Sequence, residues 1–162
     1  MSRLQGEQAG KERGANQVEI IKPEEYAVSE WAGGKTTQLY IYPQDSEYAK
    51  RNFLLRISSA TVECERSEFT SLPQVERIIL PLSGSLHLFY EGHGEKKLEP
   101  FEQDRFDGGW KTVSVGRATD FNVMLREGTQ AQVRLLDVNP NEQASVEVAA
   151  NGLTAVFAAQ GT

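Results

Sequence analysis

The feature that most limits the fold of this chain is its repeated alternation of short β-type runs with turn residues. Beyond residue 17, no segment keeps a helical apolar period over three turns, and Gly occurs 14 times. Strands of this number and spacing predict an all-β sandwich or barrel. The ten candidate strands are Thr37–Tyr42, Phe53–Val62, Arg77–Leu82, Ser85–Tyr90, Lys96–Leu98, Thr112–Val115, Asp120–Leu125, Gln132–Val138, Ser145–Val148 and Leu153–Phe157.

The turn residues between these runs favour the same fold class. Ser83-Gly84 and Gly92-His93-Gly94 separate consecutive runs and are typical of hairpins. Asn151-Gly152 is a strong two-residue hairpin signal and predicts that the last strands form a meander. Pro23, followed by two acidic residues, favours a helix of one or two turns at most.

Charge and composition narrow the classes of partner. The chain has 17 basic and 23 acidic residues, a net charge of -6, so we expect neither nucleic acid nor a membrane surface as a partner. Residues 1–17 hold no apolar run that suits a signal peptide, and they are interpreted as a disordered leader before a single domain over residues 18–162. Cys64 is the only cysteine, which excludes an intrachain disulfide and favours the cytoplasm.

Period-two alternation predicts which polar side chains share a face of a strand. Arg56 lies opposite the most apolar row of its run, and Asp120 and Asn122 share a face opposite Phe121. If the strands close into a barrel, these three polar side chains and Arg77 converge on one cavity. The alternative is that each of them points outward into solvent, and the sequence leaves both readings open.

Six ordered segments carry a family pattern: Glu30–Leu39, Phe53–Val62, Phe69–Pro73, Glu76–Leu80, Arg105–Gly108 and Thr119–Met124. The most specific pieces are the opening W-x-G-G-x-T-T and the strand D-F-N-x-M. In order and spacing the set resembles the HutD/Ves family, over roughly Tyr26 to Val138. The resemblance implies a cupin-type β-barrel of the RmlC-like jelly-roll class, bicupin-like with extra strands. It also implies a histidine-utilisation setting, in which the protein binds or senses an intermediate such as formylglutamate.

The ligand pattern of metal-binding cupins is missing from this chain. Where that motif has its metal-binding Glu, the sequence has Arg77, and the segment Phe69–Pro73 offers no imidazole in place of the paired histidines. The two histidines, His87 and His93, fall in a strand and in a Gly-rich turn and do not form a ligand pair. We therefore expect no metal and no other cofactor, and we interpret both histidines as structural.

Arg77 keeps a positive charge where the metal of a cupin would lie. Because Arg suits bidentate recognition of carboxylates, the expected guest is a small anionic metabolite paired by Arg77 and Arg56. The Trp31–Thr37 segment is expected to supply hydrogen bonds and a lid, since Gly33-Gly34 permits close backbone approach or a positive φ. The candidate ligand-binding residues are Trp31, Gly33, Gly34, Thr36, Thr37, Arg56, Arg77, Asp120 and Asn122.

Other chemistries have less support. Gly33-Gly34-Lys35-Thr36 lacks the first glycine of a phosphate loop, and no helix follows it. Cys64 lies between two glutamates, which disfavour a thiolate nucleophile. Two hypotheses remain: a non-catalytic sensor or regulator that binds a small anion, and a metal-independent isomerase or epimerase with Arg77 as charge stabiliser and Asp120 as base. The chain after Val138 is expected to close the barrel or to form the edge of a homodimer.

Overall fold

Ten strands and two short 3-10 helices make up the regular structure of the residues that the computed structural model describes, 18–148 and 151–160. All of them lie within one compact unit, residues 21–144. The helices are η1 (Pro23–Glu25) and η2 (Tyr48–Lys50). The strands are β1 (Ala27–Trp31), β2 (Gly34–Tyr42), β3 (Leu55–Val62), β4 (Arg66–Glu68), β5 (Glu76–Gly84), β6 (Leu86–Tyr90), β7 (Gly94–Leu98), β8 (Asp104–Asp107), β9 (Thr112–Val115) and β10 (Ala118–Leu125).

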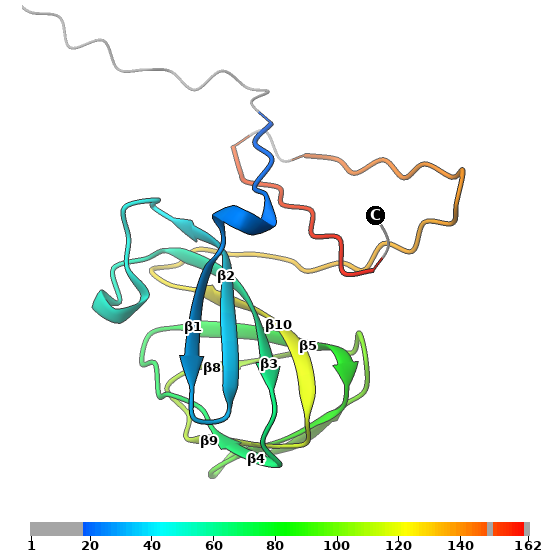
Figure 1. Cartoon of the computed structure of the whole chain (residues 1–162). Coiled ribbons are helices and arrows are strands. Elements are labelled where there is room, and N and C mark those ends of the chain that lie inside the picture. Colours follow the sequence, from blue (N-terminus) through cyan, green and yellow to red (C-terminus); the bar gives the residue numbers. More distant parts are fainter. Residues whose placement is uncertain (1–17, 149–150, 161–162) are drawn as a thin grey trace, which may run out of the picture. The chain divides into compact units, whose positions relative to one another are not determined.

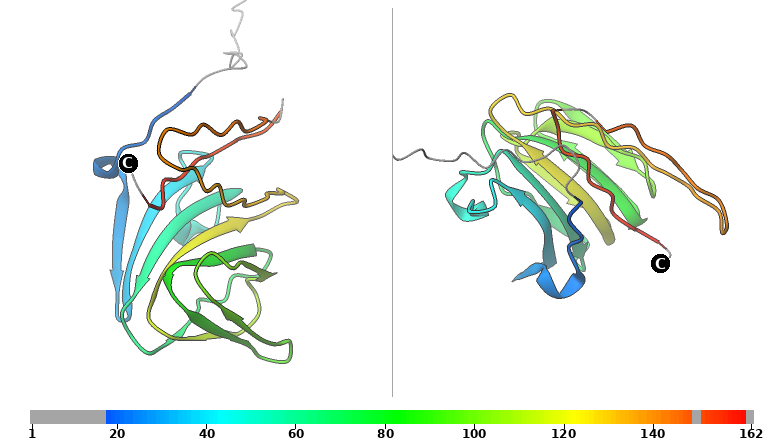
Figure 2. Two further views of the ribbon diagram at one scale, coloured as in Figure 1. Left: turned by 90° about the vertical axis from the view of Figure 1, so that its right-hand side faces the viewer. Right: turned by 90° about the horizontal axis from the view of Figure 1, so that it is seen from above.

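The strands pair into two antiparallel sheets (Figures 1 and 2). A six-stranded sheet has the order β1-β2-β3-β10-β5-β8, and a four-stranded sheet has the order β4-β9-β6-β7. The chain passes repeatedly between the sheets, and two of these crossings lie between β5 and β6 and between β9 and β10. In the β5-β6 crossing Gly84 has φ +72, and a Cβ there would lie 2.3 Å from the carbonyl oxygen of Arg117. Glycine therefore lets the two crossings lie against each other.

Apolar side chains from both sheets meet to form the main core. It combines residues of the six-stranded sheet, Ile79, Phe106 and Ala118, with residues of the four-stranded sheet, Leu86, Leu88, Tyr90 and Leu98. Alternation along each strand directs these side chains inward, so the two sheets pack face to face. The fold is therefore all-β, as the strand pattern predicts, and it is the two-sheet jelly roll that the family resemblance implies.

The opposite face of β10 is also apolar and is covered by a loop. Val123 and Leu125 pack with Ile78, and Ala131 and Val133 pack against this cluster from the segment that follows β10. Burial of this outward row leaves the alternate row of β10, which includes the polar Asp120 and Asn122, to face the interior between the sheets. In an ordinary amphipathic strand the apolar row faces the core and the polar row faces solvent. In the D-F-N-x-M strand the apolar row faces the covering loop, and Asp120 and Asn122 face the interior.

Seven of the ten predicted strands are confirmed, with ends that match or differ by at most three residues. The pattern missed β1, β4 and β8. All five residues of β1 are exposed, β4 has three residues, and β8 begins and ends with Asp, so none of them shows a clear apolar alternation. Pro23 does begin a helix, the single 3-10 turn η1.

Three predicted strands are wrong: Gln132–Val138, Ser145–Val148 and Leu153–Phe157 are not paired strands in the described residues. The carbonyl groups of Ala131 and Val133 accept hydrogen bonds from side chains of Arg105 and Gln103, where a strand would use a neighbouring backbone. In the later runs, Val148 is 66% exposed and Val156 80% exposed. An apolar run without a ladder partner or a face to bury stays irregular.

Three further expectations change with the topology. Ser83-Gly84 is not a hairpin, because β5 and β6 belong to different sheets, whereas Gly92-His93-Gly94 does join the hairpin β6-β7. The meander predicted around Asn151-Gly152 is wrong, because the described residues on either side of it form no strands. A double arrangement would need a second pair of sheets, and the described residues contain one pair.

The remaining described residues belong to a second unit by contacts and hold no helix or strand: 18–20, 145–148 and 151–160. The predicted leader, 1–17, lies outside the described residues, and the assignment of residues 18–162 to one domain stays a prediction. Within the described part of the chain, no helix is long and apolar enough to cross a membrane.

Candidate functional site

Strand register brings the predicted arginines to the same level of the six-stranded sheet. Met124 on β10 pairs with Arg56 on β3 and with Arg77 on β5, so the two arginines flank one residue. One step along the strands, Asn122 pairs with Ser58 and lies on the same face. Arg56, Arg77, Asp120 and Asn122 are 5%, 6%, 3% and 5% exposed. The structure therefore places all four polar side chains inside the fold, and excludes the outward alternative.

Arg77 is held between aromatic rings and one amide. Its guanidinium carbon lies 4.5 Å from the ring centroid of Phe69 and 5.3 Å from that of Phe106. Its Nε donates a 3.4 Å hydrogen bond to Oδ1 of Asn122. Burial lowers the pKa of Arg77 to about 10, although the Asp120 charge opposes this shift. Arg77 therefore remains a cation at neutral pH.

Arg56 has a similar environment. Its Nε donates a 2.9 Å hydrogen bond to Gln38, and its Nη1 lies 3.3 Å from Oγ of Ser58. Its guanidinium carbon lies 4.3 Å from the ring centroid of Tyr48. Burial lowers the pKa of Arg56. Among the described residues, no carboxylate forms a hydrogen bond or an ion pair with Arg56, so its positive charge is not neutralised there.

Among the residues that the structure describes, Asp120 is the one buried carboxylate, and it interacts with Arg77. Burial raises its pKa to about 7, while the Arg77 charge and a backbone hydrogen bond with Ala60 act in the opposite direction. Its Oδ1 has no hydrogen-bond partner among the described residues, and the same is true of Oγ of Ser114 on β9. The pKa of Asp120 therefore lies well above its usual range, although the positive Arg77 is nearby.

Two loops cover the end of the barrel where the arginines lie. Tyr48 of η2 stacks near Arg56, and Phe69 from the loop after β4 contacts Arg77. In the same region Leu72 and Val75 pack with Met124. The sequence analysis missed this aromatic and apolar cover, because a single aromatic residue in a loop carries no periodic signal.

The predicted lid lies at the other end of the sheet. Gly34 pairs with Val62, whereas Arg56 is six residues earlier on β3, a separation of about 20 Å along an extended strand. Trp31 is 39% exposed in the β1-β2 hairpin (Figure 1). The structure thus does not bring the glycines of the Trp31–Thr37 segment to the arginines.

The candidate residues of that segment lie in tightly packed or strand-paired positions. A Cβ on Gly33 would lie 2.2 Å from the Trp31 ring and 2.7 Å from Sγ of Cys64, so this position is packed tightly. Thr36 and Thr37 are half-buried, and they pair with Ala60 and Ser59 of β3. Thr36 falls on the same level as Asp120, two strands away, while Thr37 faces the opposite side.

The histidines lie apart from the polar interior. His87 is on the outer face of the four-stranded sheet, 3.4 Å from a carboxylate oxygen of Glu95, and His93 stacks on Trp110 at 3.9 Å between ring centroids. No group of three His, Cys, Asp or Glu side chains suited to a metal ion occurs in the part of the chain that the structure describes.

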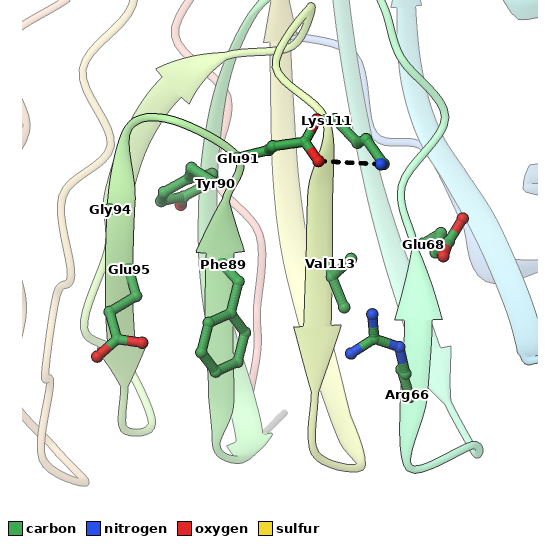
Figure 3. Close-up of a pocket in the computed structure, with 9 residues that line it drawn as sticks. All are labelled: Arg66, Glu68, Phe89, Tyr90, Glu91, Gly94, Glu95, Lys111 and Val113. Atoms are coloured by element: carbon green, nitrogen blue, oxygen red, sulfur yellow. Dashed lines mark hydrogen bonds and ion pairs between the residues drawn. The ribbon is translucent and has the colours of Figure 1, made fainter.

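Two open pockets lie outside the polar interior. One, of about 460 Å³, is on the four-stranded sheet and is shown in Figure 3. The other, of about 960 Å³, lies around Arg105, Trp110 and the turn after β10. Neither is lined by Arg56, Arg77, Asp120 or Asn122, so the arginines are enclosed in this conformation.

Two facing antiparallel sheets of this order define a cupin-like protein. The chain belongs to the HutD family, whose family model matches residues 23–162. It is similar to HutD from Pseudomonas fluorescens SBW25, at 23% identity and a TM-score of 0.56, over 65% of this chain and 58% of that one. A conserved protein of unknown function from Pseudomonas aeruginosa PAO1 gives 23% identity and a TM-score of 0.59, over 68% and 58%.

A third solved structure shares the fold at lower identity. Ectoine synthase from P. lautus is 10% identical, with a TM-score of 0.53 over 67% of this chain and 78% of that one. No protein with a curated description matches the sequence. The aligned region spans less than two thirds of both Pseudomonas proteins, and at these identities the structural likeness shows the fold alone.

Proposed function

We propose that this protein is a non-catalytic, metal-free member of the HutD family that binds a small carboxylate metabolite as a sensor or regulator. The observation that carries the proposal is the pair of buried arginines, Arg56 and Arg77, on either side of Met124. A bidentate carboxylate is the partner that a guanidinium in a dry site recognises best. A histidine-degradation intermediate such as formylglutamate has this chemistry.

The charge of the interior supports an anionic guest. The two arginines remain protonated at neutral pH, and Asp120 supplies at most one negative charge. The buried polar cluster therefore has a net positive charge that burial makes costly. A bound carboxylate would neutralise it, after the loops that carry Tyr48 and Phe69 open to admit the ligand.

A second candidate function rests on Asp120. A carboxyl group with a pKa near 7 is suited to general acid-base catalysis, and Arg77 could stabilise the charge that proton abstraction creates. This favours a metal-independent isomerase or epimerase acting on a small acidic substrate as the alternative. Proton NMR of the ligand after prolonged incubation separates the two functions, because an enzyme changes its substrate and a sensor returns it intact.

Thermal unfolding with carboxylates tests the binding site. Formate, acetate, glutarate and N-formylglutamate are the probes, and we expect at least one to raise the Tm by about 10 °C when its concentration is about 100 times its Kd. In Arg77→Met this rise should disappear, and in Arg77→Lys it should shrink, because Lys cannot bind bidentately. Arg134→Met, a change at an exposed arginine, is the matched control and should keep the full rise.

The proposal fails if no probe shifts the wild-type Tm, or if Arg77→Lys and Arg134→Met respond identically to the wild type. Should Arg77→Met not fold, Arg77→Lys still decides, since it keeps the cation and loses the planar donor pair.

Anion binding is expected to weaken as the pH rises through about 7. Above that pH Asp120 is ionised, so it repels the incoming carboxylate and competes for Arg77. In the limit where only protonated Asp120 permits binding, the Kd rises about tenfold per pH unit above 7. Isothermal titration at pH 6 and pH 8 measures the effect. Asp120→Asn should bind with little pH dependence over this range, and an unchanged dependence in that variant would assign the effect to another group.

A further inference from the structure

The outer face of the four-stranded sheet carries two rows of side chains that cross all four strands. In each row a pair of apolar or aromatic residues lies in the middle and a charged residue lies at each end. The end charges are negative in the first row and positive in the second. From β4 to β7 the rows are Glu68, Val113, Phe89 and Glu95, and then Arg66, Val115, His87 and Lys97.

The middle of this face is an exposed apolar strip. Phe89 is 36% exposed and Val115 37% exposed, and the His87 ring lies 4.1 Å from the Phe89 ring. Figure 3 shows Phe89 and Val113 side by side, with Glu95 beyond one and Arg66 and Glu68 beyond the other. An apolar strip with a charged rim on a sheet face has the anatomy of a protein interface.

We infer that this face binds a second copy of the chain, about a two-fold axis that lies in the interface, perpendicular to the strands and between the two rows. Such an axis places the first row of one copy on the second row of the other. Glu68 then faces the partner's Arg66, and Glu95 faces the partner's Lys97. In the middle, Val113 faces the partner's Val115, and Phe89 faces the partner's His87. Strands of the two copies remain aligned, as in sheets that pack face to face.

Other two-fold arrangements of the same face place like charges together. An axis parallel to the strands puts Glu68 on the partner's Glu95 and Arg66 on the partner's Lys97. An axis along either row places each end charge of that row against the same residue of the partner. An axis on the other side of the first row places Phe89 on the partner's Glu91, and Val113 on the partner's Lys111, at the ion pair drawn in Figure 3. Of these axes, only the one between the two rows matches each end charge with its opposite.

The area of the face indicates how tightly the two copies should bind. Four strands about 4.8 Å apart and about 17 Å long cover roughly 300 Å² in projection, less than the roughly 800 Å² that each partner of a standard interface buries. The dimer is therefore weak, with a Kd in the micromolar range, and it must be sought by varying concentration.

Sedimentation equilibrium of the full chain, from low micromolar to near-millimolar concentration, measures the association. The wild type is expected to pass from monomer to dimer over this range. Phe89→Lys places a charge in the apolar middle and should abolish the dimer. Lys35→Glu, an exposed charge on the six-stranded sheet, is the control and should leave the Kd unchanged. Circular dichroism checks that each variant is folded.

Charge reversal gives the sharper test, because it predicts rescue. Arg66→Glu alone and Glu68→Arg alone should each weaken the homodimer about tenfold, since each creates two like-charge contacts across the axis. The double variant restores opposite charges and should return the Kd to near the wild-type value. An equimolar mixture of the two single variants should form a heterodimer, because the all-negative edge of one meets the all-positive edge of the other.

A wild type that stays monomeric to near-millimolar concentration overturns the inference. So does a dimer that persists in Phe89→Lys, or single charge reversals that are not rescued by the double variant or by mixing. If Phe89→Lys does not fold, the mixing experiment decides the question without it.

Discussion

Replacing Asp120 with asparagine is expected to stabilise the folded protein at pH 8 and to leave its stability at pH 4 nearly unchanged. Burial raises the pKa of Asp120 from 3.8 to about 7, so ionising this group in the folded state is unfavourable. The difference corresponds to about 4 kcal/mol, which is the upper limit of the expected gain. Urea unfolding at pH 4, 6 and 8 measures the free energy of unfolding of both proteins.

The sign of this effect follows from proton binding. Between pH 3.8 and about 7 the folded wild type holds a proton on Asp120 that the unfolded chain has released. The free energy of unfolding therefore falls as the pH rises through this window, and it has lost the full contribution above pH 7. An amide cannot ionise, so Asp120→Asn should have a flatter stability profile, with the two curves meeting near pH 4.

Asp45→Asn, at an exposed position, is the matched control and should change stability little at any of these pH values. A variant Asp120→Asn that is less stable than the wild type by the same amount at pH 4 and at pH 8 would contradict the argument. That result would mean that the carboxylate makes favourable contacts with Arg77 that outweigh its burial.

If Asp120→Asn stabilises the protein, this result would also indicate a functional role for Asp120. A buried acid that lowers the stability of the fold is typical of a site used for binding or proton transfer. The proposed function supplies such a use, since the proton on Asp120 would govern the affinity for a carboxylate. The two experiments are independent, because the stability profile needs no ligand.

The sequence alone was sufficient to group the polar residues by strand face. Period-two alternation put Arg56, Asp120 and Asn122 on defined faces, and strand pairing then brought them to the same side as Arg77. It could not decide whether that side was inside or outside. The apolar row of β10 would ordinarily mark the inner face, and here the loop containing Ala131 and Val133 covers it from outside.

The sequence could not predict the positions of residues that lie outside a periodic strand pattern. Tyr48 and Phe69 contact the arginines from loops, whose paths depend on tertiary contacts that no local pattern encodes. The Gly33-Gly34 pair suggested the Trp31–Thr37 segment as a lid, but the pairing of Gly34 with Val62 sets these glycines at the far end of β3. The runs after Val138 look like strands because they are apolar, yet a strand also requires a neighbour.

Gly34→Ala is expected to destabilise the fold by about 3 kcal/mol, as the sum of two effects. Gly34 has φ +153, a conformation that costs a residue with a side chain roughly 1 to 3 kcal/mol. In addition, a Cβ at this position would lie 1.9 Å from the carbonyl oxygen of Thr61 on the neighbouring strand, so β2 and β3 must move apart. Thermal and urea unfolding measure the loss.

Gly92→Ala separates the two effects. Gly92 has φ +77 in the β6-β7 hairpin, and a Cβ there would have no atom within 4 Å. It should lose about 1 kcal/mol through backbone conformation alone. The excess loss in Gly34→Ala then measures the close contact with Thr61. Equal losses in the two variants would show that β2 and β3 adjust without cost, and that the glycine of the W-x-G-G-x-T-T motif is needed for its φ value and not for strand approach.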